Sequence, residues 1–309
     1  MKIIFMGTPD FAIPSLEKLF HSDNEILCVY TRPDGRQGRG KKKSISNLKK
    51  YCLDNNIPVR QPESFKNNHL ELNVLQKFKP DIGVVVAFGN LLPLQVLQSF
   101  KHGCINVHPS MLPKYRGPSP VITAILNGET KTGVSIIQLD EGMDSGPIIL
   151  QDSVSIEKYH DSLTLTNLLF DIGGDMLIEA ITLIKNGTLK LTFQREREAS
   201  YTQKINKSDG EINWSLSAYE INQRIRAFYP WPGAYTHIDG KLLKIMTGRI
   251  NSEQSLHPGN IKMTDEIKIG TGKGTLIPEL LQLEGKKVMS SAEFLRGNKH
   301  FDGAYANNY

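Results

Sequence analysis

An amide, an imidazole and a carboxylate lie close to glycine or proline residues in the middle of the chain. Asn106 and His108 are separated by one residue at the end of an apolar run. Asp144 lies in the sequence Gly142-Met-Asp-Ser-Gly146. Amide and imidazole donors can stabilise a tetrahedral oxyanion, and a carboxylate can orient the imidazole or help to move a proton. The set predicts group transfer between two bound substrates, such as acyl transfer to an amine.

Each half of this set also has a simpler interpretation. A bare Asn-x-His is most often a turn cap beside a packed core histidine, and an aspartate between glycines is most often a turn former. A separation of two residues places Asn106 and His108 on one face of a strand. In parallel sheets, ligands bind beyond the carboxyl ends of the strands, which is where this pair would lie. With Asp144 added, a catalytic site is the interpretation that we carry forward.

Strand and helix patterns alternate over roughly the first 190 residues. Strands are expected at 2–6, 26–30, 81–88, 103–107 and 132–139, and helices at 11–20, 70–78, 94–99, 118–126 and 161–185. Such alternation predicts an α/β domain with a Rossmann-like, doubly wound, mainly parallel sheet that helices cover on both faces.

The composition changes after Gly187. A polar stretch containing Arg-Glu-Arg-Glu is interpreted as a linker, and Ser217 with Glu220 forms a capping box ahead of a helix. About five short strands with glycine-marked turns then predict a smaller β-barrel domain of the oligonucleotide-binding (OB) type. The expected division is residues 1–189, a linker at 190–206, and residues 207–309.

The overall composition is that of an ordinary globular protein. Of 309 residues, 39% are hydrophobic and 22% are charged. The apolar stretch near the start is too short for a signal peptide, and no segment is long enough to cross a bilayer. The three cysteines are too widely spaced for a metal site, so a reducing compartment is expected. We expect a monomer in the cytoplasm with no membrane partner; a bacterial cytoplasm fits better than an organelle protein without its leader.

The positive charge is concentrated in one segment. Between Arg32 and Lys50 there are eight basic residues and one acid, Asp34. A run of charge is most often a solvated loop. Here glycines alternate with long cations, which favours a flexible arm that could bind a polyanion and become ordered on binding.

Several common chemistries lack their motifs. The Gly7-Thr-Pro-Asp-Phe segment has no Gly-x-Gly-x-x-Gly pattern, and Pro9 removes an amide that would face a pyrophosphate. No Walker loop and no His-Glu-x-x-His metal helix occurs. A Gly-x-Ser-x-Gly elbow is also missing, which disfavours an acyl-enzyme hydrolase.

Four segments resemble the methionyl-tRNA formyltransferase family in that family's order. They are Met6-Gly-Thr-Pro-Asp-Phe-Ala12, Arg36-Gln-Gly-Arg-Gly-Lys-Lys42, Asn106-Val-His-Pro-Ser-Met-Leu-Pro-Lys-Tyr-Arg-Gly117, and residues 201–236 with their Pro-Trp-Pro-Gly. The third segment is common to all enzymes that use 10-formyltetrahydrofolate, whereas the others are more specific. Met111, Ser119 and Thr202 depart from the residues usual in the family, and we expect no effect on the chemistry.

The resemblance implies the activity, the partners and the site residues. A formyl-folate-binding N-terminal domain and an OB-like C-terminal domain would transfer a formyl group from 10-formyltetrahydrofolate to methionyl-tRNA without a metal. Asn106, His108 and Asp144 match the catalytic trio. The folate would contact Ser110, Met111, Leu112 and Pro113, with the loop at Phe88 and Gly89 as a further wall. The tRNA would be held by Arg36, Arg39, Lys41, Lys42, Lys43, Lys204 and Lys207.

Other functions stay open. A sugar-nucleotide formyltransferase shares Asn-x-His and the Pro-Trp-Pro-Gly tail, but resembles this chain less at residues 6–12 and 36–42. A glycinamide ribonucleotide formyltransferase would need only about one domain's length, and a formyl-folate hydrolase would place water where the amine lies. A non-enzymatic RNA-binding module would use the barrel and the basic segment but would not require the catalytic trio.

Overall fold

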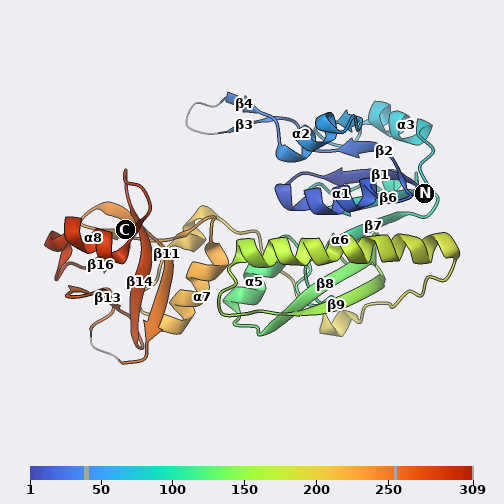
Figure 1. The fold of residues 1–309 in the computed structure, drawn as a ribbon. Helices are drawn as coiled ribbons and strands as arrows, with labels where there is room; N and C mark the ends of the chain where they lie inside the picture. The colour runs from blue at the N-terminus through green and yellow to red at the C-terminus, as the bar shows by residue number, and fades with distance from the viewer. Residues whose placement is uncertain (38–41, 254–255, 308–309) are drawn as a thin grey trace. The chain divides into compact units, whose positions relative to one another are not determined.

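A computed structural model describes residues 1–37, 42–253 and 256–307 (Figure 1). The chain divides into two compact units. The first unit comprises Met1–Pro120, Lys131–Ser155 and Thr166–Thr202, and the second comprises Val121–Thr130, Ile156–Leu165 and Gln203–Tyr309. Two short segments that interrupt the first unit in the sequence, Val121–Thr130 and Ile156–Leu165, therefore belong to the second unit. The domain limits expected from the sequence differ from this division and stay a prediction.

The first unit is built on a seven-stranded sheet. The strands are β1 (Lys2–Gly7), β2 (Glu25–Tyr30), β5 (Val59–Arg60), β6 (Ile82–Val86), β7 (Cys104–His108), β8 (Lys131–Gln138) and β9 (Ile148–Ser155). Their order is β5-β2-β1-β6-β7-β8-β9. The pairs from β5 to β7 are parallel, whereas β8 and β9 are antiparallel to their neighbours. The predicted mainly parallel α/β sheet is confirmed.

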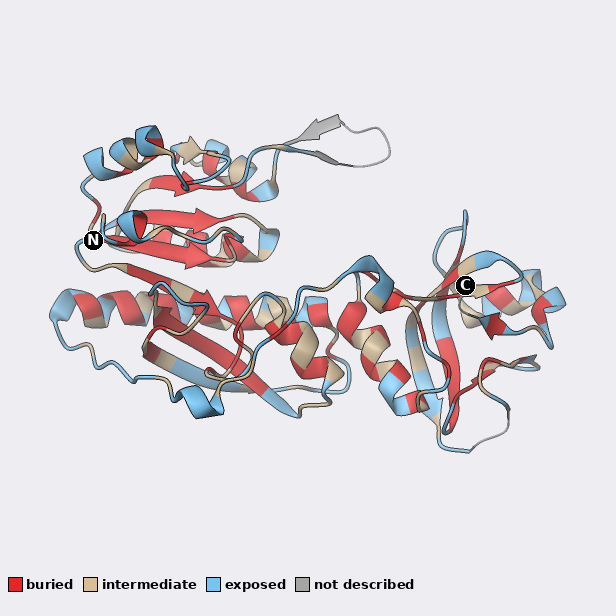
Figure 2. Cartoon of the chain, turned by 180° about the vertical axis from the view of Figure 1, so that it is seen from behind, coloured by how far each residue is buried: buried red, intermediate tan, exposed pale blue. Residues whose placement is uncertain are grey.

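Helices cover both faces of this sheet. Helices α1 (Ile13–Phe20) and α6 (Ser162–Asn186) lie on one face, where Phe11 stacks on Phe170 with 4.6 Å between ring centroids. Helices α3 (His69–Lys77) and α4 (Leu94–Leu97) supply Leu75, Val96 and Leu97 to an apolar cluster on the other. Because both faces are covered, the central strands are buried along almost their whole length (Figure 2).

The basic segment has more regular structure than its sequence predicted. Strands β3 (Gly35–Gln37) and β4 (Lys42–Ser44) pair antiparallel, and helix α2 (Asn47–Asp54) follows with Ser46 as its N-cap. Lys49 binds Asp34 through an ion pair of 2.7 Å. The centre of the expected flexible arm, residues 38–41, lies outside the described residues, and the basic residues Lys49 and Lys50 lie in α2.

A largely buried carboxylate in the first unit is paired. Glu71 is 9% exposed, accepts a hydrogen bond of 2.9 Å from the Tyr30 hydroxyl and is bound by the guanidinium of Arg60. These hydrogen bonds, above all those from Arg60, hold the pKa of Glu71 below its ordinary value. The cysteines are free and buried, and burial raises the pKa of Cys28 to about 12.

The second unit contains an antiparallel, barrel-like sheet. Its strands are β10 (Ala234–Ile238), β11 (Lys241–Asn251), β12 (Ile261–Met263), β13 (Ile267–Gly270), β14 (Thr275–Leu283), β15 (Met289–Ser290) and β16 (Ala306–Asn307). The order is β12-β13-β14-β11-β10-β16, and β15 pairs with β14. This arrangement confirms the predicted small, barrel-like β-domain.

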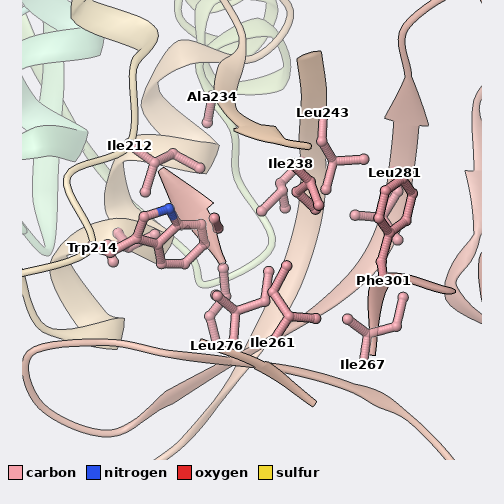
Figure 3. Close-up of a cluster of buried hydrophobic side chains, with 14 of the residues drawn as sticks. Ile212, Trp214, Ala234, Ile238, Leu243, Ile261, Ile267, Leu276, Leu281 and Phe301 are labelled. Carbon is pink, nitrogen blue, oxygen red and sulfur yellow. The ribbon is translucent and has the colours of Figure 1, made fainter. Parts of the chain in front are cut away.

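Two of the helices in this unit begin where their caps predict. Helix α7 (Ala218–Phe228) starts with the capping box of Ser217 and Glu220, and α8 (Ser291–Gly297) starts with that of Ser290 and Glu293. Beside the sheet lies a core of aliphatic and aromatic side chains that includes Trp214 (Figure 3). The indole nitrogen of Trp214 donates to the Thr236 hydroxyl at 3.0 Å, so its one polar atom is satisfied.

Candidate active site

Asn106 and His108 lie at the carboxyl end of β7. Cys104 belongs to the apolar cluster on the face of α3 and α4, and the alternation of a strand places Asn106 and His108 on that same face. His108 is 3% exposed, whereas Asn106 is half-buried. The strand therefore carries two polar side chains just beyond its apolar part.

The imidazole of His108 is held by the loop that follows β7. Its Nε2 lies 3.0 Å from the carbonyl oxygen of Tyr115. A carbonyl oxygen only accepts, so Nε2 carries a hydrogen and donates it. Tyr115 has a φ of 64°, in the left-handed region, which turns the loop back over the ring. The remaining ring nitrogen, Nδ1, is thereby directed elsewhere.

Nδ1 of His108 faces the carboxylate of Asp144. The distance from Nδ1 to Oδ2 is 3.5 Å, and the side chains of His108 and Asp144 are 4% and 17% exposed. This is an ion-pair separation and not a hydrogen bond, so Nδ1 keeps hydrogen-bonding capacity for another group. Oδ2 also accepts the backbone hydrogen of Gly117 at 2.8 Å. Within the described residues, Oδ1 of Asp144 forms no hydrogen bond.

The predicted catalytic residues come from β7 and from the turn between β8 and β9. Asp144 lies in the turn between β8 and β9, with a φ of 51°. Strand β8 is antiparallel to β7, with Gln138 opposite Ile105, so the turn after β8 starts beside the beginning of β7. The turn then folds back along β7 until Asp144 meets His108. Across the described part of the chain, the amide of Asn106 has no hydrogen-bond partner. It is a free donor on the same strand face as His108.

The segment Ser110–Pro113 lies beside this group but uses several of its polar atoms internally. Ser110 is fully buried, and its hydroxyl donates to the Lys114 carbonyl at 2.7 Å. Leu112 packs in a small apolar cluster with Ile137 and Ile148. Met111 and Pro113 are half-buried. The segment can offer a ligand its backbone and the faces of these two half-buried side chains.

Phe88 and Gly89 follow β6, on the other side of β7 from β8. The Phe88 side chain is 2% exposed and packs with the core near Phe65, so a ligand could meet only its backbone. Gly89 has a φ of 74°, and its carbonyl accepts a hydrogen bond of 2.8 Å from Arg32. The loop is thus fixed at the carboxyl edge of the sheet.

A polar segment of the predicted linker packs against the loop that contacts His108. Residues 194–202 belong to the first unit, and Gln194 donates to the carbonyl oxygens of Asp144 at 2.8 Å and Gly146 at 2.7 Å. Its own side-chain oxygen accepts from Arg116 at 3.1 Å. Sequence reasoning missed Gln194 and Arg116, since a glutamine in a polar stretch gives no sign of a partner 78 residues away.

The predicted tRNA-binding residues are only partly described. Arg39 and Lys41 lie outside the described residues, and of Arg36, Lys42 and Lys43 only the backbone is described. Lys204 and Lys207 belong to the second unit and are exposed. Neither of these two lysines forms an ion pair with any part of the chain that the structure covers.

Metal-ligand clusters and membrane-spanning helices are both absent from the described residues, 1–37, 42–253 and 256–307. Among them there is no group of three or more histidine, cysteine or acidic side chains that could hold a metal ion. No helix in the same ranges has the length and apolar character needed to pass through a membrane.

Comparisons with known families cover most of the chain. Residues 1–181 match the formyl transferase family, and residues 204–299 match the formyl transferase C-terminal domain. Among solved structures, an N-formyltransferase from Helicobacter canadensis superposes with a TM-score of 0.68 at 24% identity, covering 90% of this chain and 98% of that one. A sugar 3N-formyl transferase gives a TM-score of 0.67 at 23% identity, with coverage of 93% and 99%. At these identities the two structures share the fold.

Curated relatives are much more similar in sequence. The methionyl-tRNA formyltransferase of Caldanaerobacter subterraneus subsp. tengcongensis is 40% identical over 98% of this chain and 99% of its own length. The enzyme of the same name from Alkaliphilus oremlandii is 42% identical, with coverage of 96% and 97%. The matches therefore span both units, including the barrel that a single-domain formyltransferase would lack. The chain belongs to the methionyl-tRNA formyltransferase family.

Proposed function

We infer that this protein transfers the formyl group of 10-formyltetrahydrofolate to the α-amino group of methionyl-tRNA. The observation that carries this function is identity of about 40% to methionyl-tRNA formyltransferases over nearly the whole chain. The contact of His108 with Asp144, and the position of Asn106 on the same strand face as His108, support it, because these groups suit acyl transfer to an amine.

Asn106 and His108 are the proposed donors to the formyl oxygen. Negative charge builds on that oxygen as the amine adds to the formyl carbon. The Asn106 amide is free of other partners in the described residues, and Nδ1 of His108 is the ring nitrogen that is not hydrogen-bonded. We therefore propose that the oxyanion contact comes from Nδ1, since Nε2 already donates to the Tyr115 carbonyl.

Asp144 is proposed to serve in two ways through its two oxygens. Oδ2 faces His108 and stabilises a positive imidazole, while the Gly117 amide keeps it in place. Oδ1, free of partners among the described residues, can accept the proton that the attacking amine loses, directly or through water. Overall, the new N–C bond replaces the bond from the formyl carbon to N10, and the proton that the amine loses is passed on to N10. The ionisation state of the protein is thereby restored.

The proposed folate contacts are the loop after β6 and the segment Ser110–Pro113. A pterin needs a flat apolar slot with a few backbone hydrogen-bond partners. Ala87 and Gly89 have φ values of 48° and 74°, so the chain turns sharply at the carboxyl end of β6 and leaves backbone groups there. Leu92 and Leu139, which are partly buried beside the same apolar cluster, offer an apolar wall.

Basic residues in both units are proposed to bind the tRNA. The segment that includes Arg36, Arg39, Lys41, Lys42 and Lys43 carries the highest charge density of the chain. Lys204 and Lys207 add exposed cations in the second unit. Lysine and arginine contacts to phosphates supply affinity that falls as salt concentration rises.

One assay tests the function against its alternatives. The protein is supplied with 10-formyltetrahydrofolate and with methionyl-tRNA, an amino sugar nucleotide, or no acceptor, and the formyl group is followed. Formylation of methionyl-tRNA alone is the expected result. Transfer to the amino sugar would favour a sugar-nucleotide formyltransferase. Release of formate would indicate a formyl-folate hydrolase, and binding of tRNA without formyl transfer would indicate a non-enzymatic RNA-binding module.

A further inference from the structure

Gln194 contacts both loops that hold the catalytic pair. We propose that Gln194, anchored by Arg116, is a positioning residue that sets the Asp144 carboxylate against His108. The proposal rests on the catalytic roles inferred above for His108 and Asp144. It assigns a function to a residue that lies 50 positions beyond Asp144 and outside every catalytic motif of the sequence.

Every hydrogen-bonding group of the Gln194 side chain is engaged. The amide nitrogen donates to the carbonyl oxygens of Asp144 and Gly146, at 2.8 and 2.7 Å. The amide oxygen accepts from Nε of Arg116 at 3.1 Å. Asp144 has a φ of 51°, a conformation that non-glycine residues rarely adopt. Two hydrogen bonds to carbonyls on either side of Ser145 hold the turn in this conformation, and so fix the direction of the Asp144 side chain.

Arg116 links Gln194 to the loop after β7, which contacts both His108 and Asp144. Its neighbour Tyr115 accepts from Nε2 of His108, and its neighbour Gly117 donates to Oδ2 of Asp144. Arg116 thus lies between the two backbone groups that orient the ring and the carboxylate. Its side chain points away from them toward Gln194.

The Arg116 guanidinium is buried, and Glu196 balances its positive charge. Its side chain is 2% exposed, and Nη1 binds Glu196 at 2.9 Å and the Tyr201 hydroxyl at 2.9 Å. Burial alone would lower the pKa of Arg116, but the hydrogen bonds to Glu196 and Tyr201 outweigh it and raise that pKa. This guanidinium is buried, permanently charged and held by fixed partners, so it is a rigid anchor for Gln194.

Backbone contacts attach the rest of the segment to the same loop. The amide of Arg116 donates to the Ser200 carbonyl at 2.8 Å, and the Thr202 amide donates to the Arg116 carbonyl at 2.7 Å. The Ser200 hydroxyl accepts from the Tyr115 amide at 2.9 Å. We call residues 194–202 the strap. Loss of one side chain should therefore leave the strap in place, which makes Gln194 testable by substitution.

Gln194→Glu is the most informative variant. It keeps the shape and the acceptor for Arg116, but removes both donors and places carboxylate oxygens against two carbonyls. Gln194→Met removes all hydrogen bonds at a similar volume. Gln95→Glu makes the same charge change at an exposed glutamine in α4 of the same unit, and its side chain forms no hydrogen bond with the residues described. It is the matched control.

Single-turnover formylation of methionyl-tRNA at saturating 10-formyltetrahydrofolate is the main measurement. Gln194→Glu and Gln194→Met are expected to slow this rate by about tenfold to a hundredfold, since small displacements of catalytic groups have effects of that size. The KM values for both substrates and the thermal unfolding midpoint should stay close to those of the wild type. Gln95→Glu should match the wild type in all of these.

A double-mutant cycle with Asp144→Asn separates positioning from a general structural role. If Gln194 acts through Asp144, Gln194→Glu should slow the wild type but have little further effect on Asp144→Asn. An equal slowing in both backgrounds, a wild-type rate for both Gln194 variants, or a loss of rate that follows loss of folded protein would each overturn the proposal.

The same measurements distinguish failure of the proposal from failure of the function. No transfer to methionyl-tRNA by the wild type would refute the function, and an undiminished rate for Asp144→Asn would refute the role of that carboxylate. A slow Asp144→Asn variant beside a fully active Gln194→Glu variant would refute the positioning role alone.

Discussion

Oδ2 of Asp144 accepts the Gly117 amide at 2.8 Å and lies 3.5 Å from Nδ1 of His108. One oxygen of the carboxylate is therefore fixed by the backbone and faces the imidazole, whereas its second oxygen is free of partners among the described residues. An aspartate in this arrangement can stabilise charge on the ring without losing the ability to accept a proton elsewhere.

Removal of the Asp144 charge should slow the chemical step. Asp144→Asn preserves an oxygen that can accept from Gly117, but it no longer stabilises a charged imidazole or accepts a proton. The single-turnover rate is expected to fall at least about a hundredfold, while binding of tetrahydrofolate, measured by calorimetry, stays near that of the wild type. An unchanged rate would show that Asp144 has no catalytic role.

Removal of the Asn106 donor should act on the transition state. Asn106→Ala and the isosteric Asn106→Asp both delete the amide hydrogens, and loss of one oxyanion donor costs on the order of 3 kcal/mol, about a hundredfold in rate. Both variants should lower kcat with little change in either KM. If Asn106→Ala instead raised only the KM for the formyl donor, the side chain would be a binding group and not an oxyanion donor.

Gly117 should tolerate no side chain. Its φ is 109°, and a Cβ there would lie 2.8 Å from the Thr202 hydroxyl and 3.0 Å from the Thr202 carbonyl oxygen. Gly117→Ala is expected to destabilise the fold by about 1–3 kcal/mol and to slow formylation, because the amide that binds Asp144 must move.

Gly187 provides the control for that substitution. It also has a positive φ, 67°, but a Cβ there would meet no atom within 4 Å. Gly187→Ala should therefore lower the unfolding midpoint and leave kcat unchanged. Equal kcat values for Gly117→Ala and the wild type would argue against the Gly117–Asp144 contact as a determinant of rate.

The basic segment should govern tRNA affinity. Arg39→Ala is expected to raise the KM for methionyl-tRNA and to reduce its dependence on salt, since each lost phosphate contact removes about one unit from the slope. Lys185→Ala, at an exposed lysine near the end of α6, removes the same charge elsewhere and should have little effect. A KM for Arg39→Ala that matches the wild type at every salt concentration would identify the segment as a solvated loop.

Stability should depend on pH through Glu71. Because the Arg60 hydrogen bonds lower the pKa of Glu71, its ionised form stabilises the fold. This contribution is present above the ordinary pKa of glutamate and is lost as pH falls through the lowered value. Glu71→Gln should cost about 2 kcal/mol near neutral pH, and the cost should shrink in acid. Urea unfolding at several pH values tests this; the control Glu179→Gln, at an exposed glutamate, should cost little at any pH.

The sheet and the helix starts could be predicted because their signals are local. Strands β1 and β6 are buried on both faces and so appear as continuous apolar runs, and Ser217 with Glu220 marks the start of α7 within four residues. Strand β9 escaped prediction because much of it is exposed, which leaves no clear alternation to recognise. Helix α2 was missed because it is only eight residues long and follows a run of basic residues.

The site was predictable only as a set of residue types. Asn-x-His at a strand end and an aspartate in a glycine turn suggested the chemistry, but not the φ of Asp144 or the contacts of Tyr115 and Gly117. The strap was interpreted as linker because its polar residues find their partners near residues 113–119 and 144–146, far away in the sequence. Long-range polar contacts leave no periodicity, so only three-dimensional structure reveals them.

The strap also bears on how the protein is made. Its residues come after the whole seven-stranded sheet and after α6, yet they support the loops at the sheet's carboxyl edge. A nascent polypeptide that has emerged from the ribosome only as far as residue 189 contains Asn106, His108 and Asp144 but not the strap. The contacts of the strap with the Asp144 turn should therefore form late, once Thr202 has left the exit tunnel.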